Sequence, residues 1–262
     1  MSLSTFGMIV ATTTLGGALS VLGAAIIVRK ANAAHVPILI SFAVGALLGA
    51  VFLEILPHAL QSQVSAHTLF ATVLGGILFF FMLEKFVLWR HHHESEWEHE
   101  HGAHPHPHHE HVQPRSVIMI TIGDTTHNFV DGILVAAAFM ADTSVGIAVA
   151  MAIIAHEIPQ ELGDFLIMIN AGVSRANALL LNLASSAAMV IGGVLGYFAL
   201  GAMEGGIGPL LGFVSASMLY VAVADLIPGL HRRFDLRATL QQIALIILGV
   251  ASVPLMRVIA PH

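Results

Sequence analysis

The hydrophobic positions of this chain fall into long apolar runs that short polar connections separate. A helix needs about 20 mostly apolar residues to cross the hydrocarbon core of a bilayer. Eight such runs are predicted, at residues 6–28, 34–60, 67–90, 116–140, 144–169, 175–201, 207–229 and 238–259. The predicted fold is therefore all-α, a polytopic membrane protein with eight transmembrane helices, in which residues 1–262 form a single transmembrane domain.

The overall composition agrees with a membrane protein. Hydrophobic residues make up 56% of the chain and charged residues only 10%, whereas a soluble domain carries about 25% charged residues. The net charge of −6 is small, and no basic stretch is typical of a nucleic-acid-binding surface, so nucleic acid is not an expected partner. The chain has no Cys, which excludes thiolate metal ligands.

The basic residues predict the orientation of the spans. Cytoplasmic connections of membrane proteins carry an excess of Lys and Arg. With both termini outside, nine of the ten basic residues lie at cytoplasmic ends, and only Arg257 lies at the opposite face. The nine are Arg29, Lys30, Lys85, Arg90, Arg115, Arg175, Arg232, Arg233 and Arg237.

One connection, residues 91–115, is long and rich in histidine. Its core from His91 to His111 holds ten of the 17 His residues, with five Glu residues among them. This composition cannot form an apolar core, so we expect a disordered cytoplasmic loop between the third and fourth spans. The loop either collects metal ions weakly or is a solvated linker, and the activity of the protein is not expected to require it.

The fourth span carries ionisable residues on one face. Helical residues three or four apart share a face, and this places Asp124, His127, Asn128 and Asp131 together. A carboxylate at bilayer depth costs roughly 2.5–3.5 kcal/mol on insertion scales, so such a stripe is expected to face a partner or a water-filled cavity.

The fifth span carries a matching stripe. His156, Glu157, Gln160 and Asp164 share a face, and Glu161 lies at its edge. Imidazole and carboxylate are ligands that Zn²⁺ and related cations prefer. The sequence therefore predicts a metal site between the two spans, although a buried hydrogen-bonded pair that only fixes packing would produce part of the same pattern.

The spacing of these residues suggests how ligands are shared. His127 with Asp131, and His156 with Gln160, are pairs four residues apart, so two helices can supply one four-ligand shell. Asn128 and Glu157 lie on the neighbouring ridge and could hold a second ion. Pro159 removes a backbone hydrogen bond inside the fifth span, which membrane proteins tolerate where a helix lines a cavity.

Other polar residues in the spans have two possible roles. Asp124 and Asp164 either orient a histidine ligand or lie near an interface, and Glu161 either supports a ligand or is one at the edge of the site. Four residues are weaker candidates for the same path, since an acid near a helix end can reach the headgroups. They are Glu54, His58, Asn182 and Asp225.

The two stripes resemble a known pair of motifs. His127-Asn128-Phe129-Val130-Asp131-Gly132 and the nine residues from His156 to Asp164 are similar to the paired signatures of the Zrt/Irt-like (ZIP) metal transporters. The resemblance covers the whole chain, including the eight spans, the outside termini and the His-rich loop. It implies influx of zinc, or of iron, manganese or cadmium, into the cytoplasm across the plasma membrane (the inner membrane in a bacterium). It also implies a binuclear site and a homodimer, with no resident cofactor.

The family pattern also implies roles for individual residues. It places His127, Asp131, His156 and position 160 around the transported metal, and Asn128, Asp131 and Glu157 around a neighbouring one. This chain departs from the pattern at Gln160, where close relatives carry His or Glu. Because a Gln carbonyl is a weak, neutral ligand, the departure bears on affinity and metal preference.

Two other functions compete with transport into the cytoplasm. His156-Glu157 begins like the His-Glu-x-x-His motif of zinc peptidases, but position 160 is Gln and Pro159 interrupts the motif, so we expect no enzyme activity. Exporters of the cation-diffusion class resemble six-span proteins with a cytoplasmic C-terminal domain, a pattern that the eight runs do not match. No Walker-type loop is present, so nucleotide hydrolysis is not expected to drive transport.

Overall fold

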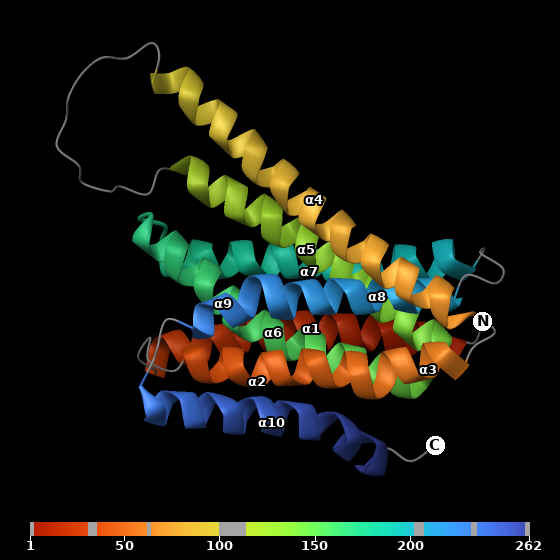
Figure 1. Cartoon of the computed structure of the whole chain (residues 1–262). Coiled ribbons are helices and arrows are strands. Elements are labelled where there is room, and N and C mark those ends of the chain that lie inside the picture. Colours follow the sequence, from red (N-terminus) through yellow and green to blue (C-terminus); the bar gives the residue numbers. More distant parts are fainter. Residues whose placement is uncertain are drawn as a thin grey trace.

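The computed structural model describes residues 3–30, 36–61, 64–99, 114–201, 207–231 and 235–259, and within them every regular element is a helix (Figure 1). Two of the long helices, which we call rods together with the uninterrupted ones, contain a π-helical segment partway along. In chain order the elements are α1 (Leu3–Lys30), α2 (Val36–Gly49) continuing through η2 (Ala50–Ile55) into α3 (Leu56–Gln61), α4 (Ala66–His99), α5 (Pro114–Ala141), α6 (Thr143–Asn170), α7 (Arg175–Gly201), α8 (Ile207–Tyr220) continuing through η3 (Val221–Leu226) into α9 (Ile227–Leu230), and α10 (Leu236–Ile259).

These elements form eight rods, which confirms the predicted all-α membrane fold. In the described part of the chain, seven of them are long and apolar enough to cross a membrane. The remaining rod, α5, has 28 residues but carries the polar stripe, and it runs alongside the others inside the bundle (Figure 1). An even number of crossings returns the chain to its starting side, and the start of α1 and the end of α10 do lie at the same end (Figure 1).

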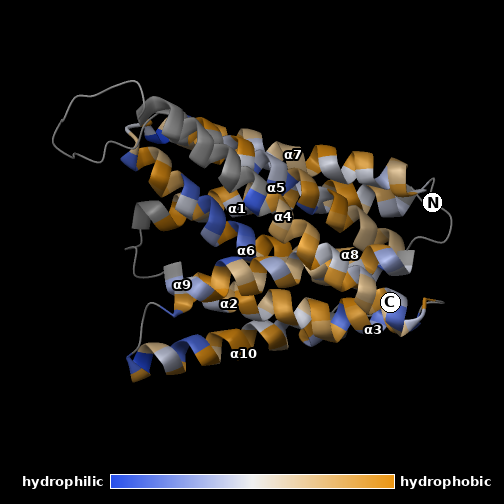
Figure 2. Ribbon diagram, turned by 45° about the horizontal axis from the view of Figure 1, so that its top comes forward, coloured by the Kyte–Doolittle hydropathy of each residue, from blue (hydrophilic) through white to orange (hydrophobic). Residues whose placement is uncertain are grey.

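The rods are arranged around α6. This helix is the most buried of the seven apolar spans, and it packs against α1, α2, α5 and α7. In contrast, α4 packs mainly on α8 and α10 mainly on α2, so both lie at the edge. Both helices expose large apolar side chains such as Phe79, Leu240 and Ile247, which suits contact with lipid. Hydrophobic residues, in orange, recur along α10 (Figure 2).

Helix α4 is longer than the span predicted at residues 67–90. It continues to His99, so the helix extends into the first part of the His-rich segment 91–115, whose predicted disorder stays a prediction. His and Glu are compatible with a helix interior, and the first Pro after the span comes only at position 105. The expectation of disorder for residues 100–113 lies outside the described residues.

The connection between α5 and α6 is the single residue Asp142, which caps α6. Its carboxylate accepts a hydrogen bond from the backbone N–H of Ser144 at 2.7 Å and another from the Ser144 hydroxyl. Partial burial alone would raise the pKa of Asp142, but these hydrogen bonds outweigh it and hold the pKa below its usual value. The cap therefore stabilises the fold at neutral pH, and its contribution falls as the pH drops through that lowered pKa.

Helices α5 and α7 touch through their backbones. A Cβ at Gly132 would overlap the carbonyl oxygen of Met189, and a Cβ at Gly192 would overlap that of Phe129. Small residues permit such close contact between membrane helices. Because Gly132 follows Asp131 directly, this contact also determines where the polar stripe of α5 lies.

We predict that Gly132→Ala destabilises the protein, since the added methyl group must push α5 and α7 apart. Overpacking of this kind costs about 1–3 kcal/mol. The measurement is the thermal unfolding midpoint of the purified protein in detergent. Gly123→Ala on the same helix is the control, because no atom lies within 4 Å of its added Cβ; equal midpoints for both variants would contradict the backbone contact.

Candidate metal centre

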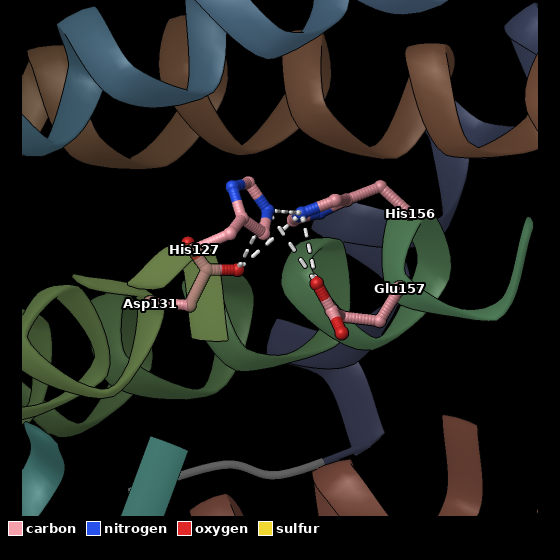
Figure 3. Close-up of side chains that lie close together, drawn as sticks. All are labelled: His127, Asp131, His156 and Glu157. Carbon is pink, nitrogen blue, oxygen red and sulfur yellow. Dashed lines mark hydrogen bonds and ion pairs between the residues drawn. The ribbon is translucent and has the colours of Figure 1, made fainter. Parts of the chain in front are cut away.

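Four side chains from α5 and α6 converge on one point in the bundle (Figure 3). His127 and Asp131 come from α5, where they lie one helical turn apart and share a face. His156 and Glu157 are consecutive residues of α6. The figure shows all four pointing toward one another from the two facing helices.

The distances between the four donor atoms are nearly equal. The two Nε2 atoms of His127 and His156 lie 3.3 Å apart, and Asp131 Oδ2 lies 3.3 Å from His156 Nε2 and 3.8 Å from His127 Nε2. Glu157 Oε1 lies 3.5 Å from His127 Nε2 and 3.7 Å from His156 Nε2. A tetrahedral zinc ion with four bonds of about 2.1 Å has ligand atoms about 3.4 Å apart, and these five distances lie close to that spacing.

Three of the four side chains are almost completely buried. Asp131 and His156 are each 2% exposed and Glu157 is 0% exposed, whereas the side chain of His127 is 27% exposed. Asp131 Oδ2 and both carboxylate oxygens of Glu157 have no hydrogen-bond partner. A buried carboxylate without a partner is strongly unfavourable, and a divalent cation bound at this point would offset that cost.

One hydrogen bond orients a histidine for metal binding. Nδ1 of His156 lies 3.2 Å from the carbonyl oxygen of Ala152. A carbonyl only accepts hydrogen bonds, so Nδ1 is the donor of this contact, and Nε2 faces the cluster. Histidine ligands of metal ions are commonly held in this way.

A second group of carboxylates lies one helical turn away. Oxygen atoms of Asp124, Glu157 and Glu161 all lie within 4.8 Å of one another, and the three residues are buried. Two unit charges at 4.8 Å repel by about 3.5 kcal/mol at an effective dielectric constant of 20. Three ionised carboxylates therefore cannot stay this close without positive charge or protons between them.

Two predicted ligands lie beside Asp124. Asn128 donates its Nδ2 to the carboxylate of Asp124 at 2.9 Å and to its carbonyl oxygen at 3.2 Å, and its Oδ1 has no partner. Gln160 is half-buried and lies within hydrogen-bonding range of the same carboxylate. The structure thus brings Glu157 to the fourth corner of the histidine cluster, and the assignment of Asn128, Gln160 and Glu161 as ligands stays a prediction.

The weaker candidates lie in three places. Glu54 is buried near the cap of α6, where the Ser144 hydroxyl lies 2.9 Å from its Oε1, and His58 is half-buried and close enough to influence Asp142 electrostatically. Asp164 lies within electrostatic range of Asp124 and of Asp225. Asn182 donates its Nδ2 to the carbonyl oxygen of Glu161 at 3.0 Å.

Sequence reasoning missed two serines that contact the acidic group. The hydroxyl of Ser185 donates to Asp124 Oδ2, and that of Ser186 donates to Glu161 Oε1 at 2.7 Å. Both serines lie on α7. Asn182 precedes Ser185 by three residues and Ser186 by four. That spacing forms a small polar stripe on an otherwise apolar span, and this signal could have found them.

The fold and the site define a class. The chain is a polytopic helical membrane protein with imidazoles and carboxylates buried in its bundle, an arrangement that typically marks a functional site in membrane proteins. A family model described as ZIP zinc transporter matches residues 3–115 and 90–257. The chain belongs to this family.

Individual relatives support the assignment. The chain is 33% identical over 239 residues to zinc transporter ZIP13 of Pongo abelii, a match that covers 84% of this chain and 66% of the relative. It is 31% identical over 265 residues to human zinc transporter ZIP13, covering 84% and 70%, and 42% identical over 119 residues to mouse zinc transporter ZIP4, covering 45% and 18%. The chain therefore spans only part of the length of these relatives.

We predict that Gln160→His tightens zinc binding by about tenfold, within the range that changes next to a metal site commonly cause. The added imidazole lies one turn from His156 and replaces a weak neutral donor. Zinc affinity of the purified protein, measured by competition with a fluorescent chelator, tests this. Gln241→His, at an exposed position of α10, is the control, and equal affinities would show that position 160 does not contact the ion.

Proposed function

We propose that this protein transports divalent metal cations, zinc first, through the site between α5 and α6. The observation that supports this most strongly is the close set of donor atoms from His127, Asp131, His156 and Glu157, all within 4.8 Å of one another. The four donors are two neutral nitrogens and two carboxylate oxygens, which together suit a doubly charged borderline cation. Their place inside a bundle of membrane spans favours passage of the ion over structural storage.

We propose that transport runs toward the cytoplasm, as the resemblance to the family implies; the positive-inside bias gives only the orientation of the helices. His127 is the one partly exposed donor of the cluster, so an arriving ion can exchange its first water there. Histidines and carboxylates must be free of protons to bind a metal, so uptake depends on pH. Movement of the helices that carry the site against the rest of the bundle would give alternating access.

The finer assignments follow the family. We propose that the chain acts in the plasma membrane, or in the inner membrane of a bacterium, and as a homodimer. Iron, manganese and cadmium remain alternative substrates, because imidazole and carboxylate suit them as well.

A zinc peptidase is the competing enzyme function, and the geometry argues against it. In a peptidase of the His-Glu-x-x-His type, the Glu stays free of the metal and acts as the base. Here Glu157 Oε1 lies as close to both histidines as Asp131 Oδ2 does. With Glu157 among the four donors, the site holds an ion but lacks the free base.

We predict that His127→Ala and Asp131→Ala each reduce zinc uptake into proteoliposomes to nearly the level of protein-free vesicles, because each variant removes a corner of the donor set. His67→Ala is the matched control, since His67 is exposed at the start of α4. All variants are compared at equal amounts of reconstituted protein. Wild-type rates in both site variants would place the transport path elsewhere.

We predict that zinc uptake stays close to wild type when the histidines between residues 91 and 111 are replaced by serine. The metal path proposed above lies between α5 and α6, so the His-rich segment is not part of it. The same vesicle assay measures the result. Loss of uptake with normal reconstitution would show that the segment takes part in transport.

A further inference from the structure

Two rods of the bundle carry an acidic residue inside a π-helical segment. Glu54 is the fifth residue of η2 and Asp225 is the fifth residue of η3, and in both rods a Pro follows three positions later. The rod with η2 is the second of eight and the rod with η3 is the seventh, so they cross the predicted membrane in opposite directions. Glu54 therefore lies in the predicted outer half of the bundle and Asp225 in the predicted inner half. Segments of this kind are frequent at functional sites.

The outer segment packs closely against α6. Glu54 is 1% exposed, and its neighbours Val51 and Ile55 are fully buried. In the first two turns of α6, against which η2 packs, Val145 and Val149 are fully buried as well. The outer part of this interface is therefore closed around a buried carboxylate.

The inner segment is exposed by comparison. Val223 of η3 is 55% exposed, and the side chain of Asp225 is exposed too. Asp164 on α6 is half-buried and lies within electrostatic range of Asp225. Two carboxylates repel each other, which opposes closure of the inner half. The two halves thus differ as expected for a protein that is closed outside and open inside.

One hydrogen bond joins Glu54 to α6. The Ser144 hydroxyl donates to Glu54 Oε1 at 2.9 Å. The same hydroxyl lies within reach of Asp142 Oδ1, but it has a single proton and donates to one carboxylate at a time. Asp142 also accepts the backbone N–H of Ser144 at 2.7 Å. The cap of α6 therefore keeps a donor when the hydroxyl binds Glu54.

This hydrogen bond suits a contact that opens and closes. A carboxylate buried among apolar side chains is unfavourable without a hydrogen bond, and Ser144 supplies one while η2 and α6 are together. When the two helices separate, water can hydrate the same carboxylate. Glu54 is thus compatible with both arrangements, whereas an apolar residue at this position would favour only the closed one.

The contact lies well away from the metal centre. Ser144 precedes His156 by 12 residues on α6, which corresponds to about 18 Å along a helix. It lies on the predicted outer side of the site, where an arriving ion must pass. Glu54 and Ser144 can therefore control access without binding the ion in the cluster.

We propose that the hydrogen bond between Glu54 and Ser144 is a latch that holds the outer half of the path closed and breaks when the metal centre becomes accessible from outside. The proposal rests on the proposed transport function and identifies a contact that regulates entry to that site. Removal of the hydroxyl should shift the population toward the arrangement that is open outside.

The test is the accessibility of the outer interface to a polar thiol reagent. The chain contains no Cys, so one introduced Cys reports on one position. Ala148 is 5% exposed and lies one turn deeper than Ser144 on the same face of α6. The rate at which a charged maleimide labels Ala148→Cys is measured on the purified full chain in lipid nanodiscs.

The two partners of the latch should have opposite effects. Ser144→Ala leaves the carboxylate of Glu54 without this donor in the closed arrangement, so we expect labelling about tenfold faster than in the parent. Glu54→Leu removes the buried carboxylate altogether, so we expect labelling no faster than in the parent. In the double variant the rate should stay low, because Ser144→Ala no longer affects a buried acid.

Two controls separate a latch from a general loss of structure. Ser41→Ala removes a buried hydroxyl that bonds only to Pro37 of its own helix among the contacts described, and we expect the parent rate. Ala43→Cys reports on a fully buried position in the inner half of α2, and its labelling should stay slow in Ser144→Ala protein. Equal acceleration at both reporters would show that the whole bundle had loosened and would overturn the latch.

The remaining outcomes separate the latch from the transport function. An unchanged rate in Ser144→Ala would overturn the latch, and so would an acceleration that persists in full beside Glu54→Leu. In either case zinc uptake that depends on His127 would leave the transport function intact. Uptake that does not depend on His127 would overturn the proposed path whatever the labelling shows.

Discussion

The structure depends on how buried carboxylates are compensated where water is scarce. Asp131 and Glu157 place oxygens without hydrogen-bond partners against two imidazole nitrogens. In a soluble protein such groups would face solvent, but here the enclosing helices are apolar on their outer faces. A divalent cation would offset their repulsion and their dehydration together, and this supports the proposed role of the cluster as a binding site for such an ion.

Helix α6 connects the parts of this arrangement. It carries His156, Glu157 and Glu161 through the most buried span, and Pro159 lies among them without ending the helix. Glu157 contributes to the histidine cluster and to the acidic group. Since one carboxylate has two oxygens, a single residue can contact two neighbouring ions or one ion in two successive positions.

The other helices determine how the two stripes meet. The glycine contacts bring α5 and α7 within backbone distance, and α7 then presents Ser185 and Ser186 to the acids of α5 and α6. At the predicted outer end of the bundle, Asp142 caps the first turn of α6. In that turn, the Ser144 hydroxyl contacts the carboxylate of Glu54. The site is therefore held by three helices, although its donor atoms in the histidine cluster come from only two.

Much of this was determined by the sequence alone. The apolar runs predicted all eight rods, because bilayer thickness requires helices of a certain length. The polar positions in the fourth and fifth runs predicted His127, Asp131, His156 and Glu157 as neighbours of a metal, since periodicity assigns residues to a face.

Only the tertiary structure decided how the facing helices are rotated against each other. Spacing along α6 favoured Gln160 as the partner of His156, but the structure brings Glu157 to the histidines and Gln160 beside Asp124. The contribution of α7 was hidden for the same reason. A helical pattern gives the face on which a residue lies, whereas the side chains that meet across an interface depend on packing between helices far apart in the sequence.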